Sequence, residues 1–261
     1  MVKGHYSWAS QPNSYICNSH VRYSVKVDQN NYLVDYTFKD NYNVTQRFKF
    51  YYPIHLANRN IRRFGVTPKL LSASSFSRAQ IRHIARYGFF MMKGNILRPD
   101  KNAIIRFYRP YCKPIAEEID LSLNRYKKNT RRAKIEFAMK FVQDIPYGIP
   151  DTLNFGKLNN GLMTPPEILV RGWGDCDSKA VLFVCILSYL INPDDMIILN
   201  QTTHHTLTAI KGKPEKGQVY ISFENTTYIL AETAGPGRFM LGDDGSTFSP
   251  SAGYKIEKVN L

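Results

Sequence analysis

The stretch RGWGDCDSKAVLFVCILSYL, residues 171–190, joins a cysteine to the start of a long apolar run. The run after Cys176 predicts a buried helix from about Cys176 to Leu190, because nearly all of its residues are apolar. Gly172 and Gly174 allow a tight turn and the close approach of a second backbone. We therefore expect Cys176 at a helix N-terminus, where free N–H groups stabilise an anion.

Three interpretations of Cys176 follow: a nucleophile, a metal ligand, or a thiol packed at the start of a core helix. Asp175 and Asp177 oppose a thiolate by their charge. We therefore expect Asp175 to cap the helix, Asp177 to point away, and a histidine to activate the thiol. A zinc site is disfavoured because no CxxC pair occurs, and the cysteines are too few for a disulfide scaffold. The four cysteines are Cys17, Cys112, Cys176 and Cys185.

A base and an acid follow the cysteine helix in order. Of six histidines, the adjacent pair His204 and His205 directly precedes a strand-like run, and a strand edge holds a base rigidly. The strand-like run TTYILAE ends at Glu232, before a glycine-rich turn. A carboxylate there can orient an imidazole as the third member of a triad. Each residue alone is more often structural, but the order Cys, His, acid on helix, strand and strand favours a catalytic set.

Periodicity along the chain predicts an α+β fold. Residues 6–53 are expected to form strands, because they hold three runs that alternate apolar and polar side chains, as antiparallel strands do. Residues 77–92 have helical spacing, and residues 114–145 are predicted to form further helices that end before Pro146. A loop at 147–166 is long enough to suggest a functional role. Helices first and strands afterwards, within the second half, indicate α+β rather than alternating βαβ units.

Charge divides the chain unevenly. The net charge is +14, and residues 59–113 hold 13 Lys and Arg against one acid, Asp100. Such a stripe attracts nucleic acid, anionic lipid or an acidic partner. It is also compatible with a merely solvated surface, which we favour because no nucleic-acid-binding motif accompanies it. We expect a β-rich basic N-terminal region at 1–115 and a catalytic core at 116–261.

Targeting and membrane signals are missing from the sequence as it stands. The sequence has no run of about 18 apolar residues, so no transmembrane helix is predicted. The first 16 residues lack the apolar core of a signal peptide. We therefore expect a cytoplasmic protein, or an exported one whose signal peptide has been removed.

Four segments together resemble the transglutaminase-like superfamily, which shares a papain-like core. They are FVQDIPYGIP (141–150), TPPEILVRGWGDCDSKAVLF (164–183), HHTLTAI (204–210) and YILAETAGPG (228–237). The likeness is greatest to a prokaryotic group with a β-rich N-terminal part, whose opening HYSW (5–8) fits. The resemblance is strong over about 130–240 and loose over 1–130. It implies a helix that carries the cysteine and packs on an antiparallel sheet.

The resemblance also implies roles for single residues. Cys176 is the nucleophile, and His205 is the base, with His204 in reserve. Glu232 stands where the family has an acid, most often aspartate. Further oxyanion or cleft candidates are Gln143, Tyr147 and Trp173; Trp173 is expected either to wall the cleft or to pack as a surface aromatic. No cofactor is implied, and no oxygen-rich loop motif indicates calcium.

Two functions are consistent with these residues. The first is thiol acyl transfer, in which Cys176 attacks a peptide or side-chain amide and the thioester is resolved by water or by an amine; we favour water. The second is a non-catalytic papain-like binding module whose basic N-terminal region docks an acidic partner. The expected partner is a protein or peptide substrate. An acidic substrate would match the charge of the basic stripe best. Nucleic acid is a weaker third possibility.

Overall fold

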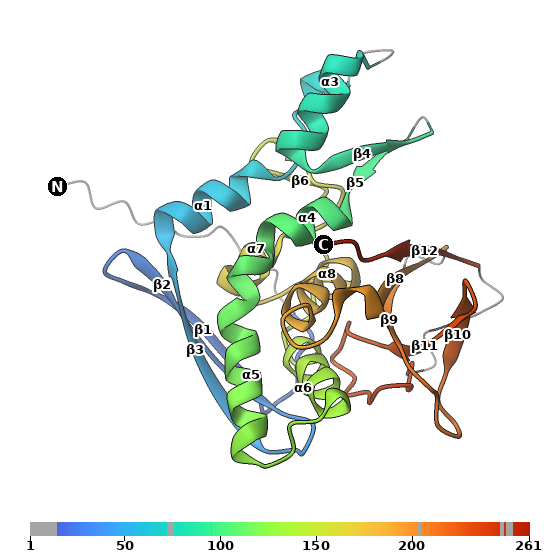
Figure 1. The fold of residues 1–261 in the computed structure, drawn as a ribbon. Helices are drawn as coiled ribbons and strands as arrows, with labels where there is room; N and C mark the ends of the chain where they lie inside the picture. Colours follow the sequence, from blue (N-terminus) through green and yellow to red (C-terminus); the bar gives the residue numbers. More distant parts are fainter. Residues whose placement is uncertain (1–14, 72–75, 95, 203–204, 246–247, 249–252) are drawn as a thin grey trace.

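The computed structural model describes residues 15–71, 76–94, 96–202, 205–245, 248 and 253–261. Figure 1 shows a small N-terminal sheet on one side, a group of helices in the middle and a larger C-terminal sheet on the other side. The chain is thus a mixture of helices and antiparallel sheets, as the periodicity predicts.

The N-terminal sheet is antiparallel, in the order β1-β2-β3. Alternate side chains of β2 are buried, including Tyr36 and Phe38, as expected for a strand with one face on a core. These two rings meet Phe141 of the helix layer edge-on, and the Tyr36 hydroxyl donates to the Phe141 carbonyl at 2.8 Å. The strands are β1 Arg22–Asp28, β2 Asn31–Lys39 and β3 Thr45–Pro53.

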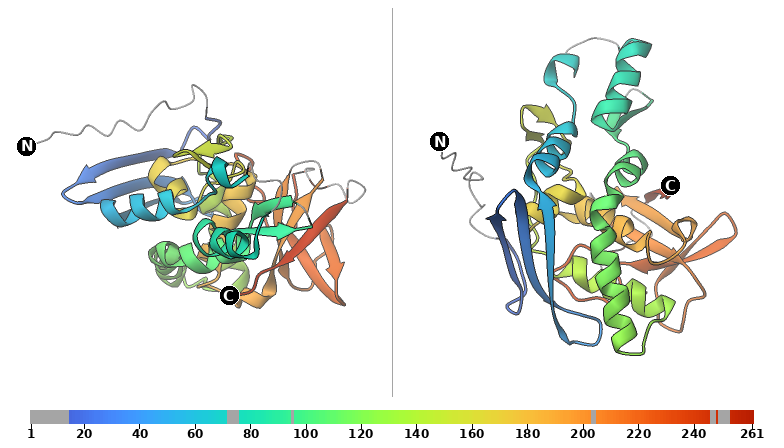
Figure 2. Two further views of the ribbon diagram at one scale, coloured as in Figure 1. Left: turned by 90° about the horizontal axis from the view of Figure 1, so that it is seen from above. Right: turned by 60° about the vertical axis from the view of Figure 1, so that its left-hand side comes forward.

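Short helices and one β-hairpin follow the first sheet, so the second half of the N-terminal region is mostly helical. Figure 2 shows the part around α3 projecting from the body of the molecule. The elements are α1 Ile54–Arg63, α2 Pro68–Leu71, α3 Arg78–His83, the π-helical turn η1 Ile84–Gly88, β4 Phe90–Lys93, β5 Ile96–Pro99, α4 Lys101–Tyr108 and the 3-10 turn η2 Arg109–Cys112.

The helix predicted over 77–92 is wrong in its second half. The α-helix ends at His83, a π turn follows, and Phe89 adopts a left-handed conformation with φ 58° before β4 begins. Phe89 is buried against Phe107 and Tyr108, with ring centroids at 4.9 and 5.6 Å. Packing of this ring therefore overrides the helical period, which sequence spacing alone cannot reveal.

The central helices match the predicted apolar segments. All residues of α8 except Asp177 are buried, and its N-terminus falls at Cys176, while its end at Leu187 comes three residues before the predicted one. The elements are α5 Lys113–Arg125, α6 Arg131–Gln143, the small hairpin β6 Leu153–Asn154 and β7 Lys157–Leu158, α7 Pro165–Arg171 and α8 Cys176–Leu187.

The C-terminal sheet is antiparallel throughout, in the order β10-β11-β9-β8-β12. Its central strands are buried on both faces: Ile198 and Ile210 pack into the helix-side core, whereas Ile197 and Ala209 pack with Phe248 on the other side. Helix α8 lies against β9. The elements are η3 Pro193–Asp195, β8 Met196–Gln201, β9 Thr206–Lys211, β10 Tyr220–Phe223, β11 Thr226–Ala231 and β12 Tyr254–Lys258.

Residues on both sides of position 115 share one buried apolar cluster, which runs from the N-terminal sheet through α6 and α8 to the C-terminal sheet. A buried carboxylate adds a polar link: Asp144 accepts from His20 at 2.8 Å and from the guanidinium of Arg238. These partners hold the pKa of Asp144 below its usual range, although burial alone would raise it. The division at 115 stays a prediction.

None of the helices in the described part of the chain has the length and apolar character needed to cross a lipid bilayer.

Candidate active site

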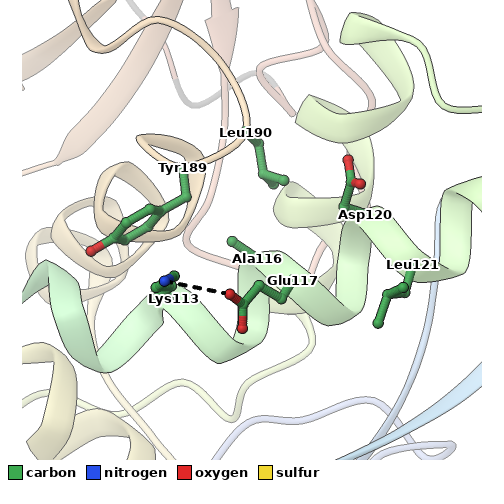
Figure 3. A pocket seen from close by; sticks show the side chains of 7 residues that line it. All are labelled: Lys113, Ala116, Glu117, Asp120, Leu121, Tyr189 and Leu190. Atoms are coloured by element: carbon green, nitrogen blue, oxygen red, sulfur yellow. Dashed lines mark ion pairs between the residues drawn. The ribbon is translucent and has the colours of Figure 1, made fainter.

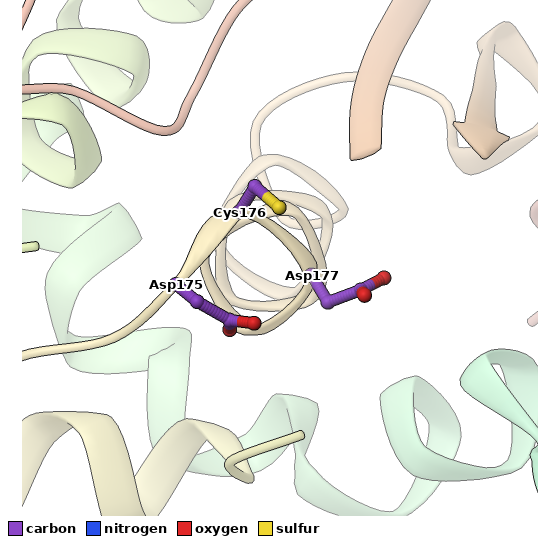
Figure 4. Close-up of side chains that lie close together, drawn as sticks. All are labelled: Asp175, Cys176 and Asp177. Atoms are coloured by element: carbon purple, nitrogen blue, oxygen red, sulfur yellow. The ribbon is translucent and has the colours of Figure 1, made fainter. Parts of the chain in front are cut away.

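Cys176 occupies the first position of α8. The side chain of Asp175 caps this helix and accepts the Ser178 N–H at 3.0 Å, as expected from the sequence. Figure 4 shows Asp175, Cys176 and Asp177 leaving the first turn in different directions. Upstream, Gly172 ends α7 with φ 74°, and a side chain there would meet the Tyr23 ring at 2.6 Å. The glycine thus permits the sharp turn that delivers the cysteine.

The structure brings His205 and Glu232 together with Cys176. His205 directly precedes β9, and Glu232 directly follows β11, which pairs with β9. Nε2 of His205 lies 2.7 Å from Oε2 of Glu232, while Oε1 of Glu232 accepts the Ala234 N–H at 2.7 Å. The imidazole is also close enough to Cys176 for the thiol to raise its pKa. Since Nε2 faces the carboxylate, Nδ1 is left for the thiol.

The environment of His205 favours its protonated form. Burial by itself lowers the pKa of His205, but hydrogen bonds to Cys176 and Glu232 and the charge of Glu232 outweigh it and raise the pKa to about 10. Glu232 is 1% exposed, so its charge acts on the imidazole with little screening by water. A protonated imidazole beside a thiol is the arrangement that stabilises a thiolate–imidazolium pair.

The two aspartates beside Cys176 are both engaged. Asp177 accepts from Nζ of Lys101 at 2.5 Å and from the Thr206 hydroxyl at 2.7 Å. Burial raises the pKa of Asp177, but the Lys101 charge more than offsets this and holds it below its usual value. Burial also raises the pKa of Asp175, to about 6. The Lys101 ammonium therefore reduces the opposition of Asp177 to a neighbouring thiolate.

Among the described residues, Asp175, Cys176 and Asp177 form the one group that could hold a metal ion, since their ligand atoms lie within 4.8 Å of one another. A cation at Asp177 would have to displace the Lys101 ammonium, and one at Asp175 would compete with the helix cap. The donor set therefore fits a metal poorly.

Gln143 lies next to the site but has no free donor for an oxyanion. It is fully buried, and its Nε2 donates to the Glu232 carbonyl at 2.7 Å and to the Phe239 carbonyl at 3.0 Å. Both amide hydrogens are thereby used. A Cβ atom on Gly235 would lie only 2.0 Å from the Gln143 carbonyl oxygen. Gly235 also has φ 67°, so the turn requires a glycine there. Gln143 thus positions the turn after Glu232, which does not fit the oxyanion role expected from the sequence.

Tyr147 lies directly against Cys176, and Trp173 lies beside it. The Tyr147 side chain is half-buried, and its main chain bridges to Gly174, two residues before Cys176; burial, and secondarily the charge of Cys176, raise the pKa of Tyr147 to about 12. Trp173 is 8% exposed and stacks on Tyr15 with ring centroids 5.0 Å apart. Of the two expectations for Trp173, its packing therefore favours a packed aromatic. His204 and the HYSW segment lie outside the described residues.

Lys179 is a site residue that the sequence analysis missed. It lies one turn beyond Cys176 on α8, is fully buried, and donates to the carbonyls of Ile145 and Ala234 at 2.5 Å each. Burial lowers its pKa to about 7. These bonds join the segment before Tyr147 to the turn after Glu232. A lone lysine at the start of an otherwise apolar helix was the signal, because a buried cation needs fixed acceptors.

A separate groove of about 580 Å³ lies between α5 and the residues that follow α8. Figure 3 shows its lining, including the ion pair of Lys113 with Glu117 at 3.7 Å and the Tyr189 ring. Cys176 is at the opposite end of α8, roughly 18 Å away at about 1.5 Å per helical residue. The groove is therefore distinct from the site at Cys176.

Comparisons with known proteins give little likeness. No protein-family model matches the chain, and no curated protein matches it. Among solved structures, calcium-bound LapG of Legionella pneumophila matches with a TM-score of 0.33 and 16% identity, over 56% of this chain and 78% of that chain. A second LapG structure from the same organism gives 0.34 and 16%, over 56% and 77%. An EGTA-treated LapG structure gives 0.29 and 18%, over 56% and 91%. Because these TM-scores are low, we draw no conclusion from the likeness.

Proposed function

We propose that this protein is a thiol acyl-transfer enzyme of the transglutaminase-like type, with Cys176 as nucleophile, His205 as base and Glu232 as the group that orients His205. The observation that carries the proposal is the position of the His205 imidazole, which lies 2.7 Å from the Glu232 carboxylate and close enough to Cys176 for the thiol to raise its pKa. Three groups so arranged on a helix N-terminus and two paired strands are what nucleophilic thiol catalysis requires.

The reaction starts from the thiolate–imidazolium pair. The Cys176 sulfur attacks the carbonyl carbon of an amide, a C–S bond forms, and the carbonyl oxygen becomes an oxyanion. When the intermediate collapses, the C–N bond breaks and the leaving amine takes the proton from His205. Water, or a second amine, then gives a proton to His205 and attacks the thioester, which releases Cys176. The His205 side chain is 20% exposed, so water has access, and we favour hydrolysis.

The test is to incubate the protein with an unfolded substrate protein and a fluorescent primary amine. New peptide N-termini measured by mass spectrometry would indicate hydrolysis, and fluorescence attached to glutamine side chains would indicate amine transfer. Acid quenching should also trap an acyl group on Cys176. Failure of every arm, with a panel of substrate proteins of different charge, would contradict the proposal.

A second role is favoured by the basic stripe: recruitment of an acidic substrate or partner. Residues 41–99 contain no Asp or Glu. Four exposed arginines on α1, α3 and η1 make no ion pair with a carboxylate anywhere in the described ranges. The four are Arg59, Arg62, Arg82 and Arg86.

Binding of polyglutamate should show this role directly. We expect its affinity to fall steeply between low salt and about 0.5 M salt, since a Debye length near 4 Å screens exposed charges. The pair of changes Arg82→Glu and Arg86→Glu should weaken binding further, and Cys176→Ala should leave it unchanged. Binding that ignores both salt and the charge reversals would contradict recruitment, and a strong preference for duplex DNA over polyglutamate would favour nucleic acid instead.

A further inference from the structure

A short hairpin, β6–β7, is fixed between the basic helix α1 and helix α7, which leads into the turn before the nucleophile. On the α1 side, Leu158 and Val66 exchange main-chain hydrogen bonds at 2.8 and 2.9 Å. A Cβ atom on Gly65, which has φ 99°, would lie 2.9 Å from the Leu158 carbonyl oxygen, so the two segments approach closely. On the α7 side, the Asn154 amide donates to the Glu167 carboxylate at 2.6 Å. The hairpin is thus tied to the body of the protein at both of its strands.

The chain that enters this hairpin starts beside the nucleophile. The Gly148 N–H donates to the Gly174 carbonyl at 3.3 Å, and Gly174 stands two residues before Cys176. Residues 148–158 therefore lead from the turn beside the nucleophile to the end of α1 (Figure 2). Phe155, between the two strands of the hairpin, lies seven residues after Gly148, so this path is at most about 25 Å long.

Three large apolar side chains are exposed along this path. Ile149 is 78% exposed, Leu153 is 55% exposed and Phe155 is 42% exposed. Single exposed apolar side chains are ordinary, but three within seven residues beside a nucleophile are a surface that a bound polypeptide would cover. We call these three residues the apolar row.

Positive charge lies at the far end of the apolar row. The Arg62 guanidinium lies over the Phe155 ring, 5.2 Å from its centroid. Arg59 stands three residues earlier on α1, and residues three apart share one face of a helix. Both arginines are exposed, and neither forms an ion pair with a carboxylate of the described residues. A chain that follows the apolar row past Phe155 therefore brings its next residues to positive charge, which favours Asp and Glu there.

We propose that the apolar row, together with the face of α1 that carries Arg59 and Arg62, binds the substrate chain next to the reacting amide. The substrate class is a polypeptide with apolar residues beside that amide and with Asp or Glu further along. The acidic residues should stand roughly five to eight residues from the amide, because an extended chain spans the path at about 3.3 Å per residue. This rests on the proposed acyl-transfer function, and it assigns a position and a spacing to the recruitment of acidic substrates.

The test uses iodoacetyl peptides, with which the Cys176 sulfur forms a C–S bond and displaces iodide. In the first peptide the reactive group is followed by Leu-Phe, two glycines and four glutamates. In the second the apolar pair is Ser-Ser, and in the third the glutamates are glutamines. Two sets, with the reactive group at the N-terminus or on a C-terminal lysine, cover both directions of the chain. The quantity measured is the rate of Cys176 alkylation by each peptide divided by the rate with iodoacetamide in the same variant.

The first peptide should react at least about tenfold faster than the serine peptide in one of the two directions, the effect of burying an apolar side chain. The double change Ile149→Ser and Leu153→Ser should remove most of this gain. The double change Arg59→Glu and Arg62→Glu should remove the advantage of glutamates over glutamines, and so should about 0.5 M salt. Leu121→Ser is the matched control: Leu121 is 48% exposed on α5, and its change should leave every ratio as in wild type.

Equal ratios for all peptides in both directions would overturn the proposal, and so would a gain that persists in the double variant of Ile149 and Leu153. If the apolar row serves a lipid surface, the protein would sediment with phosphatidylserine vesicles and no peptide would show a gain, which also overturns the proposal. A Cys176 that iodoacetamide alkylates no faster than Cys185 would contradict the proposed function itself. Rapid alkylation of Cys176 without selectivity among the peptides would contradict the binding surface alone.

Discussion

Replacement of Cys176 by alanine is expected to abolish acyl-enzyme formation and to lower turnover at least about 10⁴-fold, because Cys176 supplies the sulfur atom of the thioester. The change removes one sulfur atom from a helix whose other residues remain packed, so the fold should survive. Release of p-nitrophenol from p-nitrophenyl acetate, together with mass spectrometry of the peptide that holds Cys176, measures both effects.

Cys185→Ala is the matched control for this experiment. Cys185 lies on the same helix, is fully buried, and faces Ile105 rather than the site. Its loss should leave acylation at Cys176 intact. Full turnover in Cys176→Ala, or an acyl group found on Cys185 in wild type, would contradict the assignment of the nucleophile.

Glu232→Gln should have the second-largest effect, a loss in turnover of roughly 10²-fold to 10⁴-fold. The two oxygens of Glu232 accept hydrogen bonds from His205 and from the Ala234 N–H. In glutamine one of these two oxygens is replaced by an NH₂ group. An NH₂ group can only donate, so either His205 or the Ala234 N–H loses its acceptor. The negative charge that holds the His205 proton also disappears. The imidazole then loses both its orientation and part of its raised pKa.

The His205 titration also predicts how stability depends on pH. The folded-state pKa of about 10 exceeds the usual 6.5, so folding tightens proton binding at His205. Its contribution to the free energy of unfolding is complete below about pH 6.5 and is lost as the pH rises through about 10. Glu232→Gln should shrink this window, which NMR titration of His205 and urea unfolding at several pH values can measure.

Glu136→Gln controls for the loss of a buried carboxylate. Glu136 is 5% exposed and accepts from Arg132 on α6. Its replacement should leave the His205 titration and the turnover unchanged. A Glu232→Gln variant with a normal His205 pKa and full turnover would show that Glu232 does not orient the base.

Much of the site follows from the sequence because it depends on local order. The apolar run after Cys176 predicts α8, and the aspartate before Cys176 predicts the helix cap. The strand-like runs at β9 and β11 place His205 and Glu232 at strand ends. Antiparallel pairing of these two strands then brings the imidazole and the carboxylate together. Each of these inferences needs only the spacing of apolar residues along the sequence and the short connections between elements.

The missed features depend on contacts between distant parts of the chain. Lys101, in the basic half, forms an ion pair with Asp177, and Asp144 bonds His20 and Arg238 from opposite ends of the sequence. The amide of Gln143 turns to carbonyls of the Glu232 turn rather than to the cleft. Periodicity carries no information on such partners, because they are set by how the layers pack.

The most direct test of the central claim is the rate at which iodoacetamide alkylates Cys176 as a function of pH, in wild type and in His205→Ala, with Cys185 as an internal reference. A thiolate–imidazolium pair predicts rapid alkylation of wild type well below pH ~8.5, where an ordinary thiol becomes reactive, and loss of that reactivity in His205→Ala. Wild-type Cys176 that reacts only above this pH, or a rate that His205→Ala leaves unchanged, would contradict the paired nucleophile.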